Sequence, residues 1–340
     1  MSNLDQTRRQ QLSGFLARNG LGGASFAALS TDASQRRYFR VSDAGASWIV
    51  MDAPPPREDV RAFVAVGRHL HALGFSAPVI LAEDPASGFL LLEDLGDDTY
   101  ARVMALKPAP AGGDEASLYG LATDVLVALH GLGARALMPG LVPYTGEALI
   151  DAAMLLPEWY LPAVEGRAAT ADDIGSWRAA WRDVLAAMPS APDTLLLRDF
   201  HQDNLMWLRD RPGIRACGLL DFQDALRGHP AYDLASLVED ARRDIDPGLH
   251  AAMLDRYIAG AGVRDRADFI AAFAVQAAQR HARIIGLFVR LLKRDGKPGY
   301  LPHLPRVWRL FERSLAHEAL TPLRSWVDGR VPPAKRVFTI

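Results

Sequence analysis

Residues 195–224 read LLLRDFHQDNLMWLRDRPGIRACGLLDFQD: an apolar run, a polar loop, and a second apolar run that ends in acid. Asp199 lies in the loop, and Asn204 follows it five places later. The second run, Cys217 to Leu220, leads directly into Asp221. Two strands around a loop rich in Asp and Asn also fit an ordinary β-hairpin. The spacing therefore needs support from the rest of the chain.

The spacing D-x-x-x-x-N, followed by a strand that ends in Asp-Phe, resembles the catalytic core of kinase-like phosphotransferases. Phosphoryl transfer from ATP needs an acceptor held in line and a neutralised phosphate charge. A carboxylate at Asp199 can orient the acceptor hydroxyl and take its proton. Asn204 and Asp221 offer the hard oxygen ligands that Mg²⁺ prefers. We therefore expect Asp199 to be the catalytic base and Asn204 and Asp221 to bind the metal.

LRDFHQDN and LLDFQDALRGHPAYDLASL together resemble the aminoglycoside phosphotransferase-like, or choline kinase-like, family. Its core reads H-G-D-x-x-x-x-N and then I-D-[FW]-x-x-A-x-x-G-x-P-x-x-D-L-A. The match implies the same roles for Asp199, Asn204 and Asp221, and makes Asp233 the structural carboxylate that braces the loop. Leu197 and Arg198 stand where the family usually has His and Gly. This departure bears on how the loop is braced rather than on its chemistry.

The resemblance implies a bilobal, protein kinase-like α+β fold that uses ATP and Mg²⁺. Residues 1–95 would form a small β-rich N-lobe that binds the nucleotide. Residues 96–340 would form a helical C-lobe that carries the catalytic loop and the acceptor-binding helices. A chain of 340 residues is long enough to bury two such cores.

Composition excludes several other classes of protein. A net charge of -2 gives no electrostatic footprint for nucleic acid. The single cysteine, Cys217, excludes an internal disulfide framework and a cysteine-cluster zinc site, and its apolar surroundings indicate a core residue. The N-terminus lacks an apolar signal core, and no run of 18 apolar residues occurs. We therefore expect a cytoplasmic monomer that acts on a small molecule.

The first hundred residues predict the N-lobe elements. A helix is expected at 4–19, a hairpin at 27–41 with its turn at 31–34, a strand at 47–52, a helix at 58–73 and a strand at 89–92. By resemblance, Glu93, Asp94 and Leu95 form the hinge whose backbone meets the adenine. We place the lobe boundary here.

The usual nucleotide-binding lysine of the third strand is missing. Met51 stands there, and the four lysines of the chain are all beyond residue 100. Arginines or backbone amides must therefore neutralise the phosphates. Ser30, Thr31 and Ser34 could donate hydrogen bonds, and Arg36, Arg37 or Arg40 could add positive charge, of which we favour Arg37 or Arg40. Glu58 could pair with one of these arginines, although a solvated carboxylate at the start of a helix is the more ordinary interpretation.

The C-terminal part predicts helices at 116–132, 141–161, 170–188, 230–244, 250–258 and 267–294. In the last of these, Arg280, Arg283, Arg290 and Arg294 fall on one approximate face. Such a stripe is usually solvated or paired with acids, but it would also suit an anionic acceptor. The candidate acceptor-binding residues are His201, Glu158, Tyr160, Arg280, Arg283 and Arg290. For Tyr160 the alternative is a place in the core.

Further blocks narrow the resemblance to one branch of the family. TDASQRRYFRV, VMDAPP, LLLEDLGDDTY and RDGKPGYLPHLPR are similar to the bacterial anomeric kinases for N-acetylmuramate and N-acetylglucosamine. This implies phosphorylation of the sugar C1 hydroxyl to the α-1-phosphate during peptidoglycan recycling. An aminoglycoside or choline-type kinase remains an alternative. A nucleotide-binding pseudokinase is a second alternative, against which the complete set Asp199, Asn204 and Asp221 counts.

Overall fold

The computed structural model describes residues 6–29 and 36–338, and the chain divides into two compact units. The first unit comprises Met1–Leu121 and Gln202–Ala225, and the second comprises Ala122–His201 and Leu226–Ile340. These units do not coincide with lobes that meet at residue 95, because residues 202–225 return to the first unit. The division between His201 and Gln202 falls inside the loop that carries Asp199 and Asn204. The two lobes as drawn from the sequence stay a prediction.

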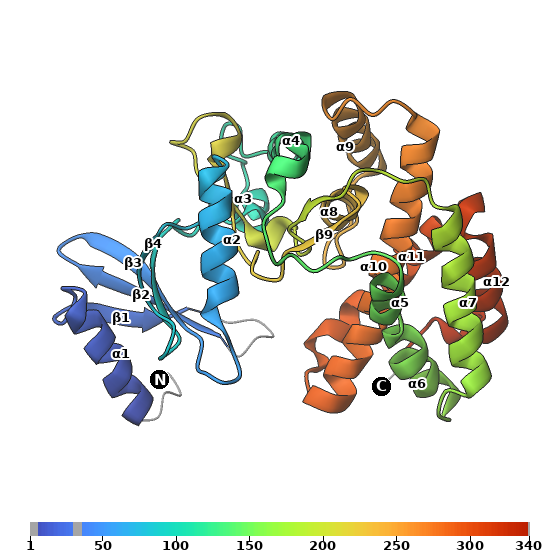
Figure 1. Ribbon diagram of the computed structural model, residues 1–340, viewed down its shortest axis with the longest axis horizontal. Helices are drawn as coiled ribbons and strands as arrows, with labels where there is room; N and C mark the ends of the chain where they lie inside the picture. The colour runs from blue at the N-terminus through green and yellow to red at the C-terminus, as the bar shows by residue number, and fades with distance from the viewer. Residues whose placement is uncertain (1–5, 30–35, 339–340) are drawn as a thin grey trace. The chain divides into compact units, whose positions relative to one another are not determined.

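A five-stranded antiparallel sheet with the order β1-β2-β3-β5-β4 organises the first unit (Figure 1). The strands are β1 (Ser25–Ala28), β2 (Arg37–Asp43), β3 (Ala46–Asp52), β4 (Ile80–Asp84) and β5 (Phe89–Glu93). Ala44 and Gly45 join β2 to β3, and both have positive φ, the requirement of a tight type I′ hairpin turn. The predicted strands at 47–52 and 89–92 are thus confirmed. The predicted turn at 31–34, with Ser34, lies outside the described residues.

Two helices accompany this sheet. Helix α1 (Gln6–Arg18) packs Leu12, Phe15 and Leu16 into a buried cluster with side chains of β2, β3 and β5. Helix α2 (Val60–Ala72) begins at the N-cap residue Asp59, whose carboxylate accepts a hydrogen bond from a backbone N–H of its first turn. The ring of Phe63 in α2 lies 4.7 Å from that of Phe222. The segment that follows Asp221 is therefore anchored beside α2.

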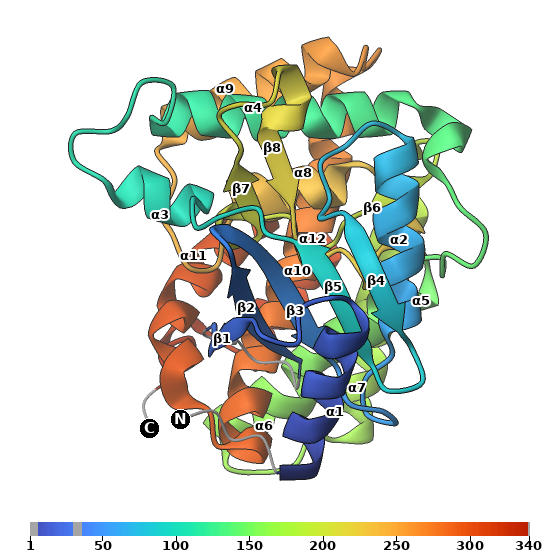
Figure 2. The same ribbon diagram turned by 90° about the vertical axis from the view of Figure 1, so that its left-hand side faces the viewer.

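The strand that leads to Asp221 has a partner that the sequence analysis did not identify. β8 (Cys217–Leu219) pairs antiparallel with β7 (Leu205–Trp207), which begins immediately after Asn204 (Figure 2). The strand before the loop, β6 (Thr194–Leu196), instead pairs with β9 (Leu226–Gly228) in the second unit. The loop is therefore not the tip of a simple hairpin. Each of its flanking strands is fixed by a different neighbour.

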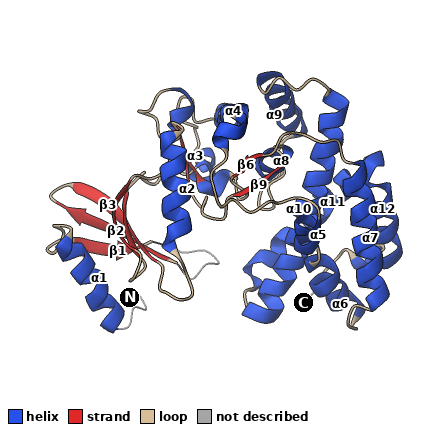
Figure 3. Ribbon diagram, in the orientation of Figure 1, coloured by secondary structure: helices blue, strands red, loops and turns tan. Residues whose placement is uncertain are grey.

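The second unit is almost entirely helical apart from β6 and β9 (Figure 3). Its helices include α5 (Glu147–Ala153), α6 (Leu161–Glu165), α7 (Ala171–Ala187), α8 (Ala231–Val238), α9 (Pro247–Gly260), α10 (Arg266–Asp295), α11 (Leu304–Leu315) and α12 (Thr321–Arg330). Helices α3 (Tyr100–Ala105) and α4 (Glu115–Gly131) precede them, and α4 crosses the division between the units. The predicted helix at 230–244 is too long, because α8 ends at Val238. No helix in the described ranges is both long and apolar enough to cross a membrane.

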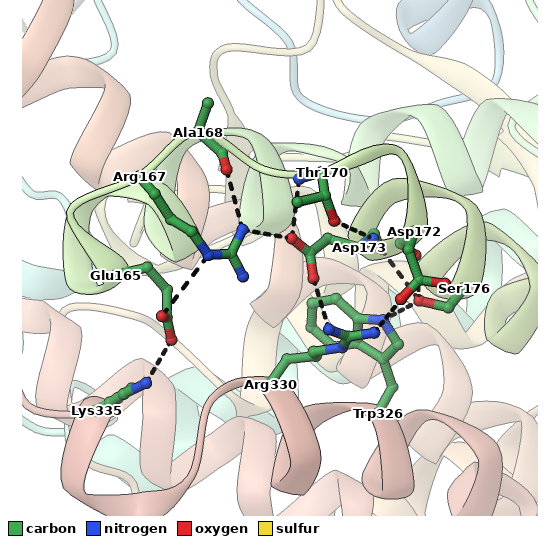
Figure 4. Close-up of polar contacts among 10 residues, drawn as sticks. All are labelled: Glu165, Arg167, Ala168, Thr170, Asp172, Asp173, Ser176, Trp326, Arg330 and Lys335. Carbon is green, nitrogen blue, oxygen red and sulfur yellow. Dashed lines mark hydrogen bonds and ion pairs between the residues drawn. The ribbon is translucent and has the colours of Figure 1, made fainter.

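Polar contacts join α7 to α12 in the second unit (Figure 4). Asp173 is fully buried, and its carboxylate accepts hydrogen bonds from the Thr170 backbone N–H at 2.9 Å and from Arg167 at 2.7 Å. Arg330 of α12 lies 3.1 Å from the same carboxylate. Burial raises the pKa of Asp173. The hydrogen bonds from Arg167 and Thr170 have the opposite and larger effect, and they lower this pKa to about 2. The helix cap and the arginines therefore hold an ionised carboxylate inside the core.

Helix α10 runs through the core of the second unit. Ile284, Ile285, Phe288 and Val289 are buried on it, in one cluster with residues of α7, α11 and α12. Gly286 faces the π-helical turn Leu156–Tyr160, and a Cβ there would lie 2.1 Å from the backbone C and O of Leu155. Only a glycine allows this approach of two backbones.

We predict that Gly286→Ala destabilises the protein by about 1–3 kcal/mol or more, since the overlap is with backbone that cannot rotate away. Gly175→Ala is the matched control, because it is an exposed helical glycine whose added Cβ meets nothing within 4 Å. The control should gain about 0.5–1 kcal/mol from helix propensity. Urea denaturation measures both changes, and equal midpoints for the two variants would contradict the close approach.

Candidate functional site

The predicted metal ligands lie together in the first unit. Asn204 ends the 3₁₀ turn Gln202–Asn204, and its backbone carbonyl accepts a hydrogen bond from the Leu220 N–H at 2.9 Å. Its side-chain Nδ2 lies 3.5 Å from Oδ2 of Asp221. Gln223 donates to the other carboxylate oxygen of Asp221 at 2.8 Å. An amide side chain and an exposed carboxylate so close together fit one Mg²⁺ that takes its other ligands from water and phosphate, with the amide turned to present its oxygen.

Asp221 also has an unusual backbone. Its φ is 57°, in the left-handed region that residues other than glycine seldom adopt. Such strain persists where the surroundings determine it, and it often marks a functional position. Here the β7–β8 pairing before Asp221 and the buried ring of Phe222 after it fix the chain on both sides.

Arg36, which the sequence favours less than Arg37 and Arg40, makes an ion pair next to α2. Nε of Arg36 is 3.4 Å from Oε2 of Glu58, just before α2, so the pairing of Glu58 with an arginine is confirmed and the solvated alternative is wrong. Burial raises the pKa of Tyr38 to about 12, while the charge of Arg36 lowers it and those of Asp221 and Glu58 raise it. Arg36, Tyr38, Glu58 and Asp221 thus form one electrostatic group.

The two arginines that were preferred instead have carboxylate partners. Arg37 lies 2.8 Å from the fully buried Asp52, which also accepts two hydrogen bonds from Arg8. Arg40 makes ion pairs with Asp94 at 2.7 Å and Asp97 at 2.9 Å. Arg40 therefore holds the predicted hinge, and its charge is already matched by two acids.

The predicted adenine-binding segment follows β5. The Glu93 carboxylate accepts hydrogen bonds from the Val79 N–H at 3.2 Å and from Arg211 at 2.5 Å. A Cβ on Gly218 would lie 3.2 Å from the side chain of Leu95. These contacts fix the segment from both sides, and its contact with adenine stays a prediction.

In the second unit, a buried carboxylate braces the predicted base. Asp233 of α8 accepts hydrogen bonds from the backbone N–H groups of Leu197 at 2.6 Å and Arg198 at 2.8 Å. Arg198 has φ of 69°, so it adopts the conformation for which the family uses glycine. Burial raises the pKa of Asp233 to about 7, although the two backbone donors lower it. The loop is braced through its backbone, and this requires neither the family's His nor its Gly.

Asp199 faces positive charge from α10. Its Oδ1 lies 3.7 Å from Nη2 of Arg283. Burial raises the pKa of Asp199, but Arg283, His201, Arg198 and Arg280 together lower it below its usual range. Asp199 is therefore ionised at neutral pH, as a group that orients a hydroxyl must be.

The other predicted acceptor residues divide into two groups. Arg280 and His201 are buried, and both act electrostatically on Asp199. Arg290 is half-buried and Glu158 is exposed, and neither is among the charges that act on Asp199.

Tyr160 is fully buried, donates to the Lys335 carbonyl at 2.8 Å and packs on Trp308. A ring in that core cannot stack on a sugar, so the core alternative holds for Tyr160.

A separate pocket of about 220 Å³ lies between residues 238–245 and α11. Arg306 and Arg309 line it, and each lies 3.0 Å from Asp244, while Arg313 lies 2.8 Å from Glu239. These arginines are already paired with acids. The pocket therefore gives no reason to assign the binding site of the phosphoryl acceptor to a place other than Asp199.

We predict that Arg283→Gln shifts the acidic limb of the kcat/KM profile to higher pH. The physical reason is that Arg283 lowers the pKa of Asp199, so its loss lets burial raise that pKa. Arg266→Gln is the control, since Arg266 lies on the same helix with 59% of its side chain exposed. An unmoved acidic limb in Arg283→Gln would separate Arg283 from the titration of the base.

The chain is similar to several known proteins. The family model described as "Phosphotransferase enzyme family" matches residues 25–270. The chain belongs to this family. A protein of Caulobacter vibrioides named N-acetylmuramate/N-acetylglucosamine kinase is 37% identical over 98% of this chain and 99% of its own length. One of the same name from Pseudomonas aeruginosa is 38% identical over 84% of this chain and 82% of its own.

A solved structure of a choline/ethanolamine kinase family protein from Mesorhizobium loti has a TM-score of 0.62. It is 18% identical and covers 94% of this chain and 99% of its own, a likeness that speaks for the fold alone. The predicted protein kinase-like α+β fold is confirmed, and the protein is a phosphotransferase.

Proposed function

We propose that this phosphotransferase is an ATP-dependent kinase that phosphorylates the C1 hydroxyl of N-acetylmuramate and N-acetylglucosamine. The product is the α-1-phosphate, formed in the cytoplasm by a monomer for peptidoglycan recycling. The observation that carries the proposal is a complete set of Asp199, Asn204 and Asp221 in a chain that matches a kinase of that name over almost its whole length. The basic surroundings of Asp199 also suit an anionic sugar better than a polycationic aminoglycoside.

Each of these residues has a distinct task in the proposal. Asp199 accepts a hydrogen bond from the C1 hydroxyl and takes its proton as the sugar oxygen bonds to the γ-phosphorus of ATP and the bond from that phosphorus to ADP breaks. Asp233 keeps the backbone before Asp199 in place, and Arg283 keeps the carboxylate ionised. Asn204 and Asp221 would hold Mg²⁺, which when bound neutralises the charge of the nucleotide phosphates.

Arg36 takes the place of the missing lysine. In protein kinases that lysine pairs with a glutamate of the helix after the third strand, and it contacts the non-transferred phosphates. Glu58 precedes the corresponding helix α2, and Arg36 is its partner. The electrostatic influence of Asp221 on Tyr38, which Arg36 and Glu58 also influence, supports a position of this pair near the proposed metal site. Met51 cannot serve, because it is uncharged and fully buried.

Arg36→Ala should raise the KM for ATP by about 10–100-fold, the value of a charge-assisted hydrogen bond. Arg36→Lys should keep most of the affinity. Arg61→Ala provides the control, because Arg61 lies on α2 with 76% of its side chain exposed. If steady-state kinetics give all three variants the wild-type KM for ATP, another group binds the phosphates.

The function itself is tested with a panel of acceptors, ATP and Mg²⁺, with the position of phosphate in the product read by ³¹P NMR. We expect an anomeric phosphate on both amino sugars and no product with EDTA. Asp199→Asn should fold and bind ATP normally but lower kcat by about 10²–10⁴-fold.

Two results would overturn the proposal. Faster phosphorylation of choline or kanamycin than of either amino sugar would leave only the phosphotransferase family. Nucleotide binding without turnover of any acceptor would favour the pseudokinase alternative.

A further inference from the structure

Three segments of the second unit bring charged side chains together at Asp199. The first is the loop 199–201, the second is the segment 239–242 after α8, and the third is one turn of α10 at 280–283. Short distances connect them: Arg283 lies 3.7 Å from Asp199, His281 lies 3.3 Å from Glu239, and Arg242 lies 3.4 Å from His201. Apart from the adjacent Arg198, the charges that act on Asp199 and His201 come from these same segments, so their side chains form one charged cluster beside the predicted base.

Arg280 of this cluster carries buried N–H donors that have no acceptor among the residues that the structure describes. Only 2% of the residue is exposed, and in the described part of the chain nothing accepts a hydrogen bond from its Nε or its Nη1. Burial lowers its pKa, and the charges that act on it include Asp199 and Asp240. Burying guanidinium donors without partners is costly, so they indicate a group that arrives with the ligand.

Asp240 has the complementary deficiency. It is 1% exposed, and its Oδ1 accepts a hydrogen bond from the Arg242 backbone N–H at 2.8 Å. Its Oδ2 is buried and accepts no hydrogen bond from any residue that the structure describes. The cluster thus offers unused donors at Arg280 and an unused acceptor at Asp240, and the charge of Asp240 acts on Arg280. A ligand that satisfies both must carry an acceptor and a donor.

We infer that Arg280 and Asp240 form a subsite for the acetamido group at C2 of the sugar, with Arg280 donating to the carbonyl oxygen and Asp240 accepting from the N–H. This inference rests on the proposed function. The acetamido group is common to both proposed acceptors, and C2 is adjacent to the C1 hydroxyl that Asp199 orients. An amide presents the required acceptor and donor side by side. Arg283 remains a positioning residue for Asp199.

The test compares N-acetylglucosamine, glucose and N-acetylmuramate as acceptors. Wild type should prefer N-acetylglucosamine to glucose. In Arg280→Gln and in the isosteric Asp240→Asn, kcat/KM for N-acetylglucosamine should fall by about 10–100-fold. The value for glucose, which lacks the acetamido group, should change little in Asp240→Asn. In Arg280→Gln it should fall less than the value for N-acetylglucosamine, because the loss of a charge that keeps Asp199 ionised affects both sugars, and the preference still collapses. The KM for ATP and the melting temperature should stay near wild type, as they should in the exposed control Arg266→Ala.

Several results would overturn the subsite. Equal losses on glucose and N-acetylglucosamine would mean that the pair only supports Asp199. Unchanged kinetics on all three sugars would remove both residues from recognition. Loss of N-acetylmuramate alone would assign Arg280 to the lactyl carboxylate. If Arg280→Gln fails to fold, Asp240→Asn decides, together with the wild-type preference between N-acetylglucosamine and glucose. If the wild type phosphorylates choline or kanamycin and neither amino sugar, the proposed function itself has failed.

Discussion

The contact on which the catalytic segment depends is the pair of hydrogen bonds from the Leu197 and Arg198 N–H groups to the buried carboxylate of Asp233. These bonds join the end of β6 to α8, 36 residues further along the chain in the case of Leu197. They also hold Arg198 in a left-handed conformation that costs a residue other than glycine about 1–2 kcal/mol. Asp199 follows directly, so its direction is set by a buried backbone contact.

Charge on α10 then decides the state of that carboxylate. Burial by itself would favour a protonated Asp199, and the arginines at 280 and 283 reverse this tendency. They can do so because residues three apart lie on the same face of a helix. Gly286, one turn further along, brings the same helix against the backbone of Leu155. One helix therefore supplies both the packing of the second unit and the field around its proposed base.

In the first unit, charge is distributed by pairing. Asp52 forms ion pairs with Arg8 and Arg37. Asp94 pairs with Arg40, and Glu58 pairs with Arg36. A sequence without an N-terminal lysine thus keeps several guanidinium groups around its sheet. Arg36 is the one whose partner precedes α2 and whose neighbour Tyr38 also responds to Asp221.

From the sequence one could predict the elements that show a regular hydrophobic pattern and the motif residues that show a characteristic spacing. Asp199, Asn204 and Asp221 were predicted because their spacing resembles the core of kinase-like phosphotransferases, and the strands at 47–52 and 89–92 because apolar runs mark them. The ion pairs between arginines and acids could be assigned only from the fold. Arg36, Arg37 and Arg40 are close together in the sequence and have the same side chain, so the sequence does not distinguish their partners. Asp240 carried no signal, because an aspartate after a helix is ordinarily solvated. Tyr160 was ambiguous for the converse reason: an aromatic side chain fits a core or a sugar site equally well until its burial is known.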